Sequence, residues 1–348
     1  MSTAQPPAAT PALPDRSTRL MLFGIFQILL GCLCGLMGLM MVVVSVLGPM
    51  VKAAGAPQGE AINAQMMIPA MVLYLAMAVA LIWLGVGSIR ARRWAWTLTV
   101  VVSWMWLIMG VIGCVVFVLF AGPMMSAAIE QQPKMKMPPQ ALVIMRIITG
   151  AVLACIYILL PAIFVIFYHR ESVRATCQRR DPQVRWTDRC PMPVLALSIL
   201  HASGAALYMP STAAYGFVMP VFGVFLSGAA GAAVILLLTL AMAYLAWGTY
   251  RLQMAAWWGT LLLWIVGILN MVAFSQTGLM EMYEKMRMPP AQLEMIRKSG
   301  LIEMMSRWMP WMGLVGGAAW LGYLLYVRRY FVRNVEGASG DTWPSREA

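Results

Sequence analysis

Three polar side chains lie in stretches of the sequence that are otherwise apolar: Gln27, His201 and Asn270. Ionisable and polar groups inside a bilayer are costly and often mark a substrate or ion path. The three are therefore candidates for a shared site near the membrane midplane. Hydrogen bonding between helices explains them without a ligand, and we favour that interpretation. His201 with Ser203 is the one pair that could offer an enzyme a base and a nucleophile.

Methionine is abundant, with 32 residues, and thioether sulfur is a ligand for Cu(I). Two observations weaken a copper interpretation. Lysine and arginine interleave the methionines and would repel a cation, and methionine is also a flexible apolar filler. The sequence feature that suggests copper binding is a set of three M-x-M pairs: Met135 with Met137, Met280 with Met282, and Met286 with Met288.

The six cysteines give no recognisable framework. Four lie in apolar stretches, whereas Cys177 and Cys190 lie in a polar segment with His169. A metal site there is conceivable, but the spacing fits no standard zinc pattern. We therefore expect no catalytic, cofactor-binding or metal-binding residues.

All 13 acidic residues lie outside the apolar stretches. Proton- and sodium-coupled pumps usually carry carboxylates within the bilayer, so this chain is a poor candidate for one. Backbone carbonyls at broken helices could still coordinate Na⁺.

Composition indicates a membrane protein. Of the 348 residues, 61% are hydrophobic and 11% are charged, against about 25% charged in a soluble domain. Charge-free runs longer than about 20 residues can each cross a bilayer, and in lipid such runs must be helical. The net charge of +12 comes from basic residues beside these runs, which favours membrane orientation over nucleic-acid binding.

We predict an all-α, polytopic transmembrane bundle of about eight helices. The charge-free run 192–250 must hold two helices, which we expect to join at Ser227–Gly228, the first of them kinked near Pro210 or Pro220. Gly31 with Gly35, and Gly313 with Gly317, permit close helix packing. The predicted spans are 20–48, 66–89, 94–120, 141–168, two within 192–250, 255–275 and 310–327.

An internal repeat predicts two tandem, parallel four-helix halves. The block KMKMPP at 134–139 recurs as KMRMPP at 285–290, and GSIR at 87–90 resembles GTYR at 248–251. An even number of helices per unit returns the chain to its starting side, so the halves run in the same sense.

The predicted organisation has five parts. The first apolar stretch is too long for a cleavable signal peptide, so we expect a retained helix. In the loop 276–307 we expect short helices lying on the membrane, with a start at Pro289–Pro290 and a stop at Gly300; it could be a lid, a docking surface or a long loop. The parts are a disordered cytosolic tail 1–18, a first repeat 19–168, a basic cytosolic linker 169–191, a second repeat 192–333 containing the amphipathic outer loop 276–307, and a polar cytosolic tail 334–348.

Orientation follows from the basic residues. With both termini in the cytoplasm, most of the 25 lysines and arginines fall on the cytosolic side. Trp94 with Trp96, and Trp257 with Trp258, would form a cytosolic aromatic belt. We expect a multi-pass protein of a bacterial-type inner membrane.

The leading functional hypothesis is a non-enzymatic structural or partner-binding membrane component. Its contact surfaces would be the linker 169–191 and the outer loop 276–307. Its partners would be the lipid bilayer, with anionic lipid at 169–191, and a protein partner or a second copy. The alternative is a transporter or channel for a neutral or uncoupled solute, with its site between the halves near Gln27, His201 and Asn270.

Overall fold

Long apolar helices dominate the computed structural model, which describes residues 14–53, 64–130, 138–277, 279–286 and 290–339. Within these residues, seven helices are long and apolar enough to cross a membrane. Large apolar side chains lie exposed along them, as lipid-facing surfaces require. The prediction of an all-α, multi-pass membrane protein is confirmed. The seven are α1 (Ser17–Ala53), α2 (Ala64–Ile89), α3 (Arg93–Glu130), α4 to α5 (Pro139–Tyr168), α7 (Met192–Ala213), α8 (Gly228–Tyr250) and α9 (Met254–Thr277).

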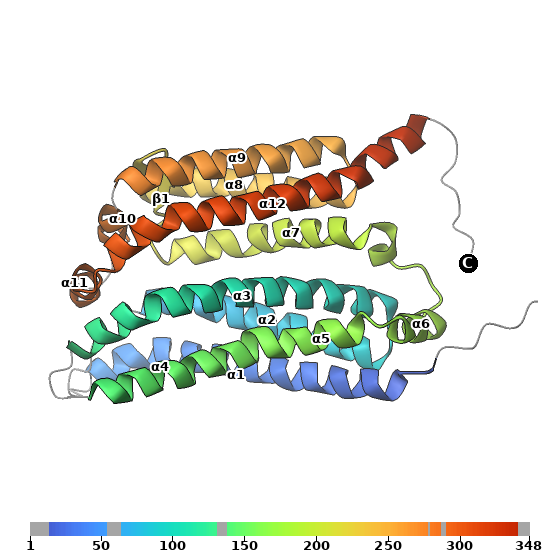
Figure 1. Cartoon of the computed structure of the whole chain (residues 1–348), viewed down its shortest axis with the longest axis horizontal. Coiled ribbons are helices and arrows are strands. Elements are labelled where there is room, and N and C mark those ends of the chain that lie inside the picture. The colour runs from blue at the N-terminus through green and yellow to red at the C-terminus, as the bar shows by residue number, and fades with distance from the viewer. Residues whose placement is uncertain (1–13, 54–63, 131–137, 278, 287–289, 340–348) are drawn as a thin grey trace, which may run out of the picture.

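The predicted eighth span lies within α12 (Leu301–Ser339), which is longer than expected at both ends. It continues through Pro310 and runs the length of the bundle beside α9 (Figure 1). Glycine, tryptophan and tyrosine interrupt its aliphatic residues, so α12 is less apolar than the other seven.

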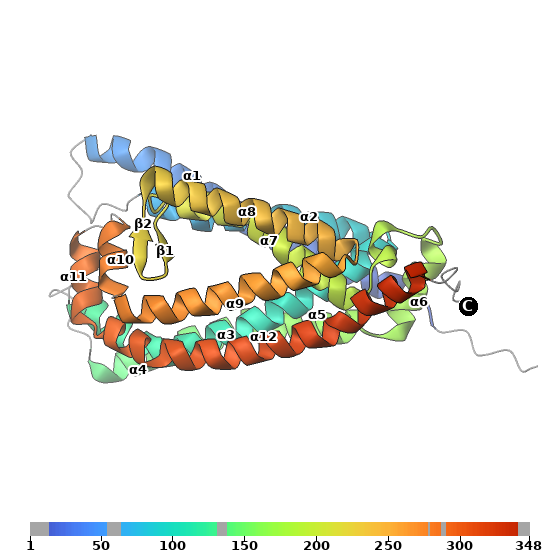
Figure 2. The same ribbon diagram turned by 90° about the horizontal axis from the view of Figure 1, so that it is seen from above.

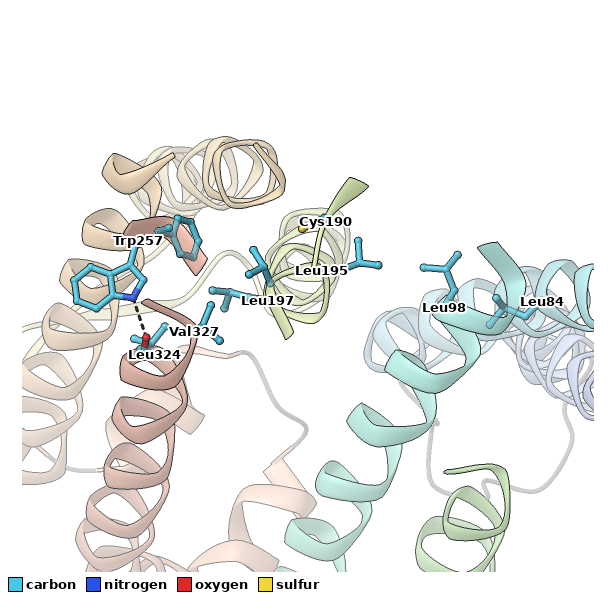
Figure 3. Close-up of a cluster of buried hydrophobic side chains, with 10 residues drawn as sticks. Leu84, Leu98, Cys190, Leu195, Leu197, Trp257, Leu324 and Val327 are labelled. Atoms are coloured by element: carbon cyan, nitrogen blue, oxygen red, sulfur yellow. Dashed lines mark hydrogen bonds between the residues drawn. The ribbon is translucent and has the colours of Figure 1, made fainter. Parts of the chain in front are cut away.

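The helices gather in two groups. Figure 1 shows α1, α2, α3 and α4–α5 on one side, and α7, α8, α9 and α12 on the other. Figure 2 shows the same helices from above, running lengthwise and converging toward the end where α6 (Glu171–Arg180) lies. The groups meet where α7 contacts α2 and α3. In that core, Leu195 of α7 faces Leu98, while Leu197 faces Val327 (Figure 3).

Glycines allow the closest helix contacts. A Cβ on Gly85 of α2 would lie 2.7 Å from the carbonyl oxygen of Gly24 on α1, so only glycine fits without a shift. Gly31 packs against Ala78 of α2, and Gly317 packs against Ile268 of α9. The predicted small-residue contacts therefore operate between helices of one chain.

The connection between α7 and α8 differs from the expected tight turn. Ser227 and Gly228 mark the start of α8, but a hairpin of β1 (Met219–Val221) and β2 (Val224–Leu226) precedes them. Pro210 lies inside α7, whereas Pro220 lies in β1. The hairpin closes through Phe222 and Gly223, both at positive φ, as a two-residue turn requires.

A π-helical segment interrupts the fourth span. It is η1 (Cys155–Leu159), between α4 (Pro139–Ala154) and α5 (Leu160–Tyr168). Pro161 is the second residue after it, and a proline lacks the N–H that an α-helix needs at that place.

Within the predicted loop 276–307, the described residues form two short helices, α10 (Leu279–Lys285) and α11 (Pro290–Lys298), whereas residues from Leu301 onward already belong to α12. Gly300 adopts a φ of +63° between α11 and α12, and Glu294 pairs with Lys298 at 2.7 Å. The linker 169–191 is also ordered, with α6 (Glu171–Arg180) and the 3-10 helix η2 (Trp186–Arg189).

Candidate functional site

Gln27 is buried between α1 and α3. Its side chain is 2% exposed, and its Nε2 donates to Thr99 Oγ1 at 3.5 Å. Its Oε1 has no hydrogen-bond partner among the described residues. Exchanging the amide oxygen and nitrogen would leave the NH₂ group unpaired instead, so this polar group is only half satisfied.

His201 makes the corresponding contact in the other group of helices. Its Nε2 lies 3.1 Å from Thr260 Oγ1 on α9. That hydroxyl donates its hydrogen to the Ala256 carbonyl at 2.9 Å. Nε2 must therefore carry the proton and donate it to Thr260. Ser203 Oγ donates to Ile199 O of its own helix at 2.6 Å, so the structure does not join it to His201.

Asn270 holds the hairpin. Its Oδ1 accepts from the Phe222 N–H at 2.7 Å, and its Nδ2 donates to the Pro220 carbonyl at 3.0 Å. These bonds fix a turn in which Phe222 has a φ of +45°, a conformation that side chains rarely adopt.

The three candidates have separate partners and do not share a hydrogen-bonded site. Two of them instead follow one scheme, in which a polar residue of the first helix of a group bonds a threonine of the third helix. Each threonine lies three residues after a buried tryptophan, Trp96 or Trp257.

The two tryptophans also have matching partners. Trp96 Nε1 donates to the Tyr168 carbonyl at 2.8 Å, and Trp257 Nε1 donates to the Leu324 carbonyl at 2.9 Å (Figure 3). Both side chains are buried, so they secure the third helix to the fourth rather than face an aromatic belt.

The turns before these tryptophans match as well. Ala91 and Leu252 both have positive φ. In the first turn Arg92 N donates to Gly87 O, and in the second Gln253 N donates to Gly248 O, each at 2.9 Å.

Asp181 is the centre of the polar end of the molecule. Its side chain is 2% exposed, and it accepts bonds from Arg185 at 2.7 and 3.1 Å and from the Arg93 N–H at 3.3 Å. Arg92 lies 3.6 Å away. The Arg185 hydrogen bonds lower the pKa of Asp181. The carboxylate thus holds the linker against the turn between α2 and α3.

The linker cysteines are buried in different apolar clusters, Cys177 beside Tyr168 and Cys190 beside Val194. Burial raises the pKa of each thiol to about 12, which suppresses the thiolate that metals and electrophiles need. His169 lies exposed at the end of α5. No metal-binding group of histidine, cysteine and acidic side chains occurs among the described residues.

Three outer methionines pack as apolar side chains. Met282, Met286 and Met305 surround a cluster formed by Val218, Phe225, Phe274 and Leu279. Met135, Met137 and Met288 lie outside the described residues.

Sequence reasoning missed Thr99, Thr260 and Asp181. The repeat offers a signal for the threonines, because they occupy the same position after the two matched turns. Nothing in the sequence distinguishes Asp181 from the other linker acids. Comparisons with family models, with curated proteins and with solved structures found no match to this chain.

Proposed function

We propose that this chain is a non-enzymatic membrane component with a structural or partner-binding role. The observation that carries the proposal is the use of its intramembrane polar groups. Gln27 and His201 each bond a threonine within their own group of helices, and Asn270 bonds the hairpin backbone. Because these polar groups already hydrogen-bond within the protein, they support a structural role better than a path for a solute.

The cavity between α9 and α12 supports the same conclusion. It has a volume of about 340 Å³ and is lined by Trp264, Ile268, Met271, Val272, Pro310, Gly313, Leu314, Gly317 and Ala318. Among these residues only Trp264 carries a polar side-chain group, its indole N–H, so the lining gives a charged or strongly polar solute little to replace its contacts with water.

We also propose that the chain is a tandem repeat of two parallel four-helix halves, with α12 as the eighth span. Three features support it: the paired turns, the paired tryptophan bonds and the paired threonine bonds. The linker 169–191 then joins the halves on the cytosolic side of a bacterial-type inner membrane, because arginines gather there at the ends of the spans.

The partner-binding surface would be the linker. Val184 and Trp186 are exposed apolar side chains in this otherwise polar segment, and they could contact a protein partner. The test places a photo-crosslinking amino acid at Val184 in cells, with Leu237, an exposed residue of α8, as the matched control position. A discrete protein adduct from position 184 and not from 237 supports the proposal. Adducts to lipid alone from both positions contradict it.

Transport is tested directly in proteoliposomes. The proposal expects neutral solutes such as glycerol and urea to cross at the rate of protein-free vesicles. A saturable flux that His201→Ala abolishes would instead establish the solute path as the function.

A further inference from the structure

A polar cavity of about 380 Å³ opens beside the turn between α2 and α3. Three arginines, Arg90, Arg92 and Arg185, and two tryptophans, Trp83 and Trp94, line it. The indoles are stacked, with ring centroids 4.4 Å apart. The candidate span of α2 ends at Ile89 and that of α3 begins at Arg93, so the cavity lies where the apolar helices meet the polar end.

The charges around the cavity do not balance. Asp181 neutralises Arg185 through two hydrogen bonds and reaches Arg92 only at 3.6 Å. Asp188 pairs with Arg93 at 3.4 Å. The exposed Arg90 has no ion-pair partner among the described residues. Four arginines against two carboxylates leave a positive site, and guanidinium groups bind phosphate oxygens well.

An exposed apolar stripe leads away from the cavity along α2. Val79, Trp83 and Val86 are 70%, 50% and 36% exposed, and their spacing places them on one face of the helix. A ligand with a phosphate beside an apolar chain would fit both features at once.

We propose that this cavity binds the phosphate of an anionic glycerophospholipid headgroup, with an acyl chain along the α2 stripe. The inference goes beyond the proposed function and refines the expectation from the sequence that anionic lipid lies at the linker 169–191. It places the anionic lipid at the turn between α2 and α3 instead, a turn that the sequence marked only as part of the internal repeat.

The same charges select against zwitterionic lipid. The described lining of the cavity holds no acidic side chain, and the nearby Asp181 is already paired with Arg185, so this lining offers no carboxylate to the ammonium of a choline or ethanolamine headgroup. Removing each arginine from a membrane-facing site weakens anionic-lipid binding roughly fivefold.

The experiment is native mass spectrometry of the full-length protein in detergent, titrated with phosphatidylglycerol or phosphatidylcholine. The test variants are Arg90→Gln, which breaks no ion pair among the described residues, and Arg90→Gln/Arg92→Gln. Arg251→Gln is the matched control, because Arg251 occupies the equivalent turn, where Gln253 replaces Arg92. A linker variant, Arg179→Gln/Arg180→Gln, separates the cavity from the linker. A further arm adds inorganic phosphate as a competitor.

We expect the wild type to prefer phosphatidylglycerol, with affinity roughly fivefold lower in Arg90→Gln and about 25-fold lower in the double variant, and unchanged in Arg251→Gln. Equal loss in Arg251→Gln would overturn the inference. So would loss only in the linker variant, which would place the anionic lipid at the linker 169–191. Equal binding of both lipids would exclude both the cavity and the linker as anionic-lipid sites. If inorganic phosphate binds and phosphatidylglycerol does not displace it, the site takes a soluble anion and the lipid assignment is wrong.

Discussion

Replacing Asp181 by asparagine should release the linker from the turn between α2 and α3. The substitution keeps the shape of the side chain and removes the charge that accepts two bonds from Arg185 and one from the Arg93 N–H. Losing one partner of a buried ion pair costs about 3–5 kcal/mol. The side chains of Arg185 and Arg92 are 29% and 40% exposed, so water partly compensates, and we expect a loss of about 2 kcal/mol.

Cys177 reports this release. It is a residue of α6, is 1% exposed and packs with Val173 and Tyr168 on the buried face of that helix. The Asp181 N–H donates to the Cys177 carbonyl at 2.9 Å. Opening of α6 would expose the thiol to a water-soluble maleimide. A loss of about 2 kcal/mol makes labelling roughly 30-fold faster when opening is a rapid equilibrium. Peptide mass spectrometry identifies the labelled cysteine.

The control is Glu171→Gln, which removes the same charge from an exposed position in the first turn of α6, at the opposite end of the helix from Asp181. Its labelling should change by at most about fivefold, through the lost interaction with the helix dipole. If Asp181→Asn also labels at the wild-type rate, the carboxylate does not secure the linker and the reasoning fails.

The pH dependence has a defined sign. Because folding lowers the pKa of Asp181 from 3.8, its stabilisation is complete above that value and is lost as the pH falls through the lower folded value. The wild type should therefore open in acid below pH 3.8, measured with a pyridyl disulfide that reacts at low pH. Asp181→Asn should lack this step, and an identical acid step in the variant would contradict the assignment.

Three further substitutions test the packing. Gly85→Ala should lower the apparent melting temperature in detergent, because the new Cβ meets a backbone oxygen at 2.7 Å. Gly267→Ala has open space around the new Cβ, so it should leave the melting temperature unchanged or raise it, since alanine is up to about 1 kcal/mol more favourable than glycine in a helix. Equal effects of the two substitutions would contradict this packing. Asn270→Ala should speed hydrogen exchange of the hairpin amides roughly tenfold, and unchanged exchange would show that the hairpin needs no such bond. Trp257→Phe should destabilise by about 1 kcal/mol through its lost hydrogen bond, whereas exposed Trp258→Phe should not, and the reverse order in thermal denaturation would refute the assignment.

Helices of this chain were predictable because length and apolar character alone decide whether a segment can cross lipid. The outer loop was predictable for a local reason, since Pro290 starts α11 and Gly300 supplies the left-handed residue that ends it. The hairpin 219–226 was not, because its residues are as apolar as those of a span. The only residues in this segment that are typical of a turn are Gly223, which follows Phe222, and Pro220.

Gln27 and His201 are buried and Asn270 is partly exposed, and the hydrogen-bond partners of all three could not be predicted from the sequence. The sequence places Gln27 and His201 at similar depths, whereas hydrogen bonding depends on which helix face each presents. The structure directs both to threonines of third helices. Trp96 and Trp257 were predicted to lie at the membrane–water interface because they are near the ends of spans. Each is buried instead, and its indole N–H donates a hydrogen bond to a backbone carbonyl of the fourth helix of its group.

Membrane insertion with the linker and the hairpin on opposite sides is tested by cysteine labelling in sealed vesicles of known orientation. Val184→Cys in the linker and Phe222→Cys in the hairpin introduce thiols at exposed positions, and an impermeant maleimide reaches one face only. The account predicts that position 184 labels only from the cytosolic face and position 222 only from the opposite face. Labelling of both positions from the same face would contradict it.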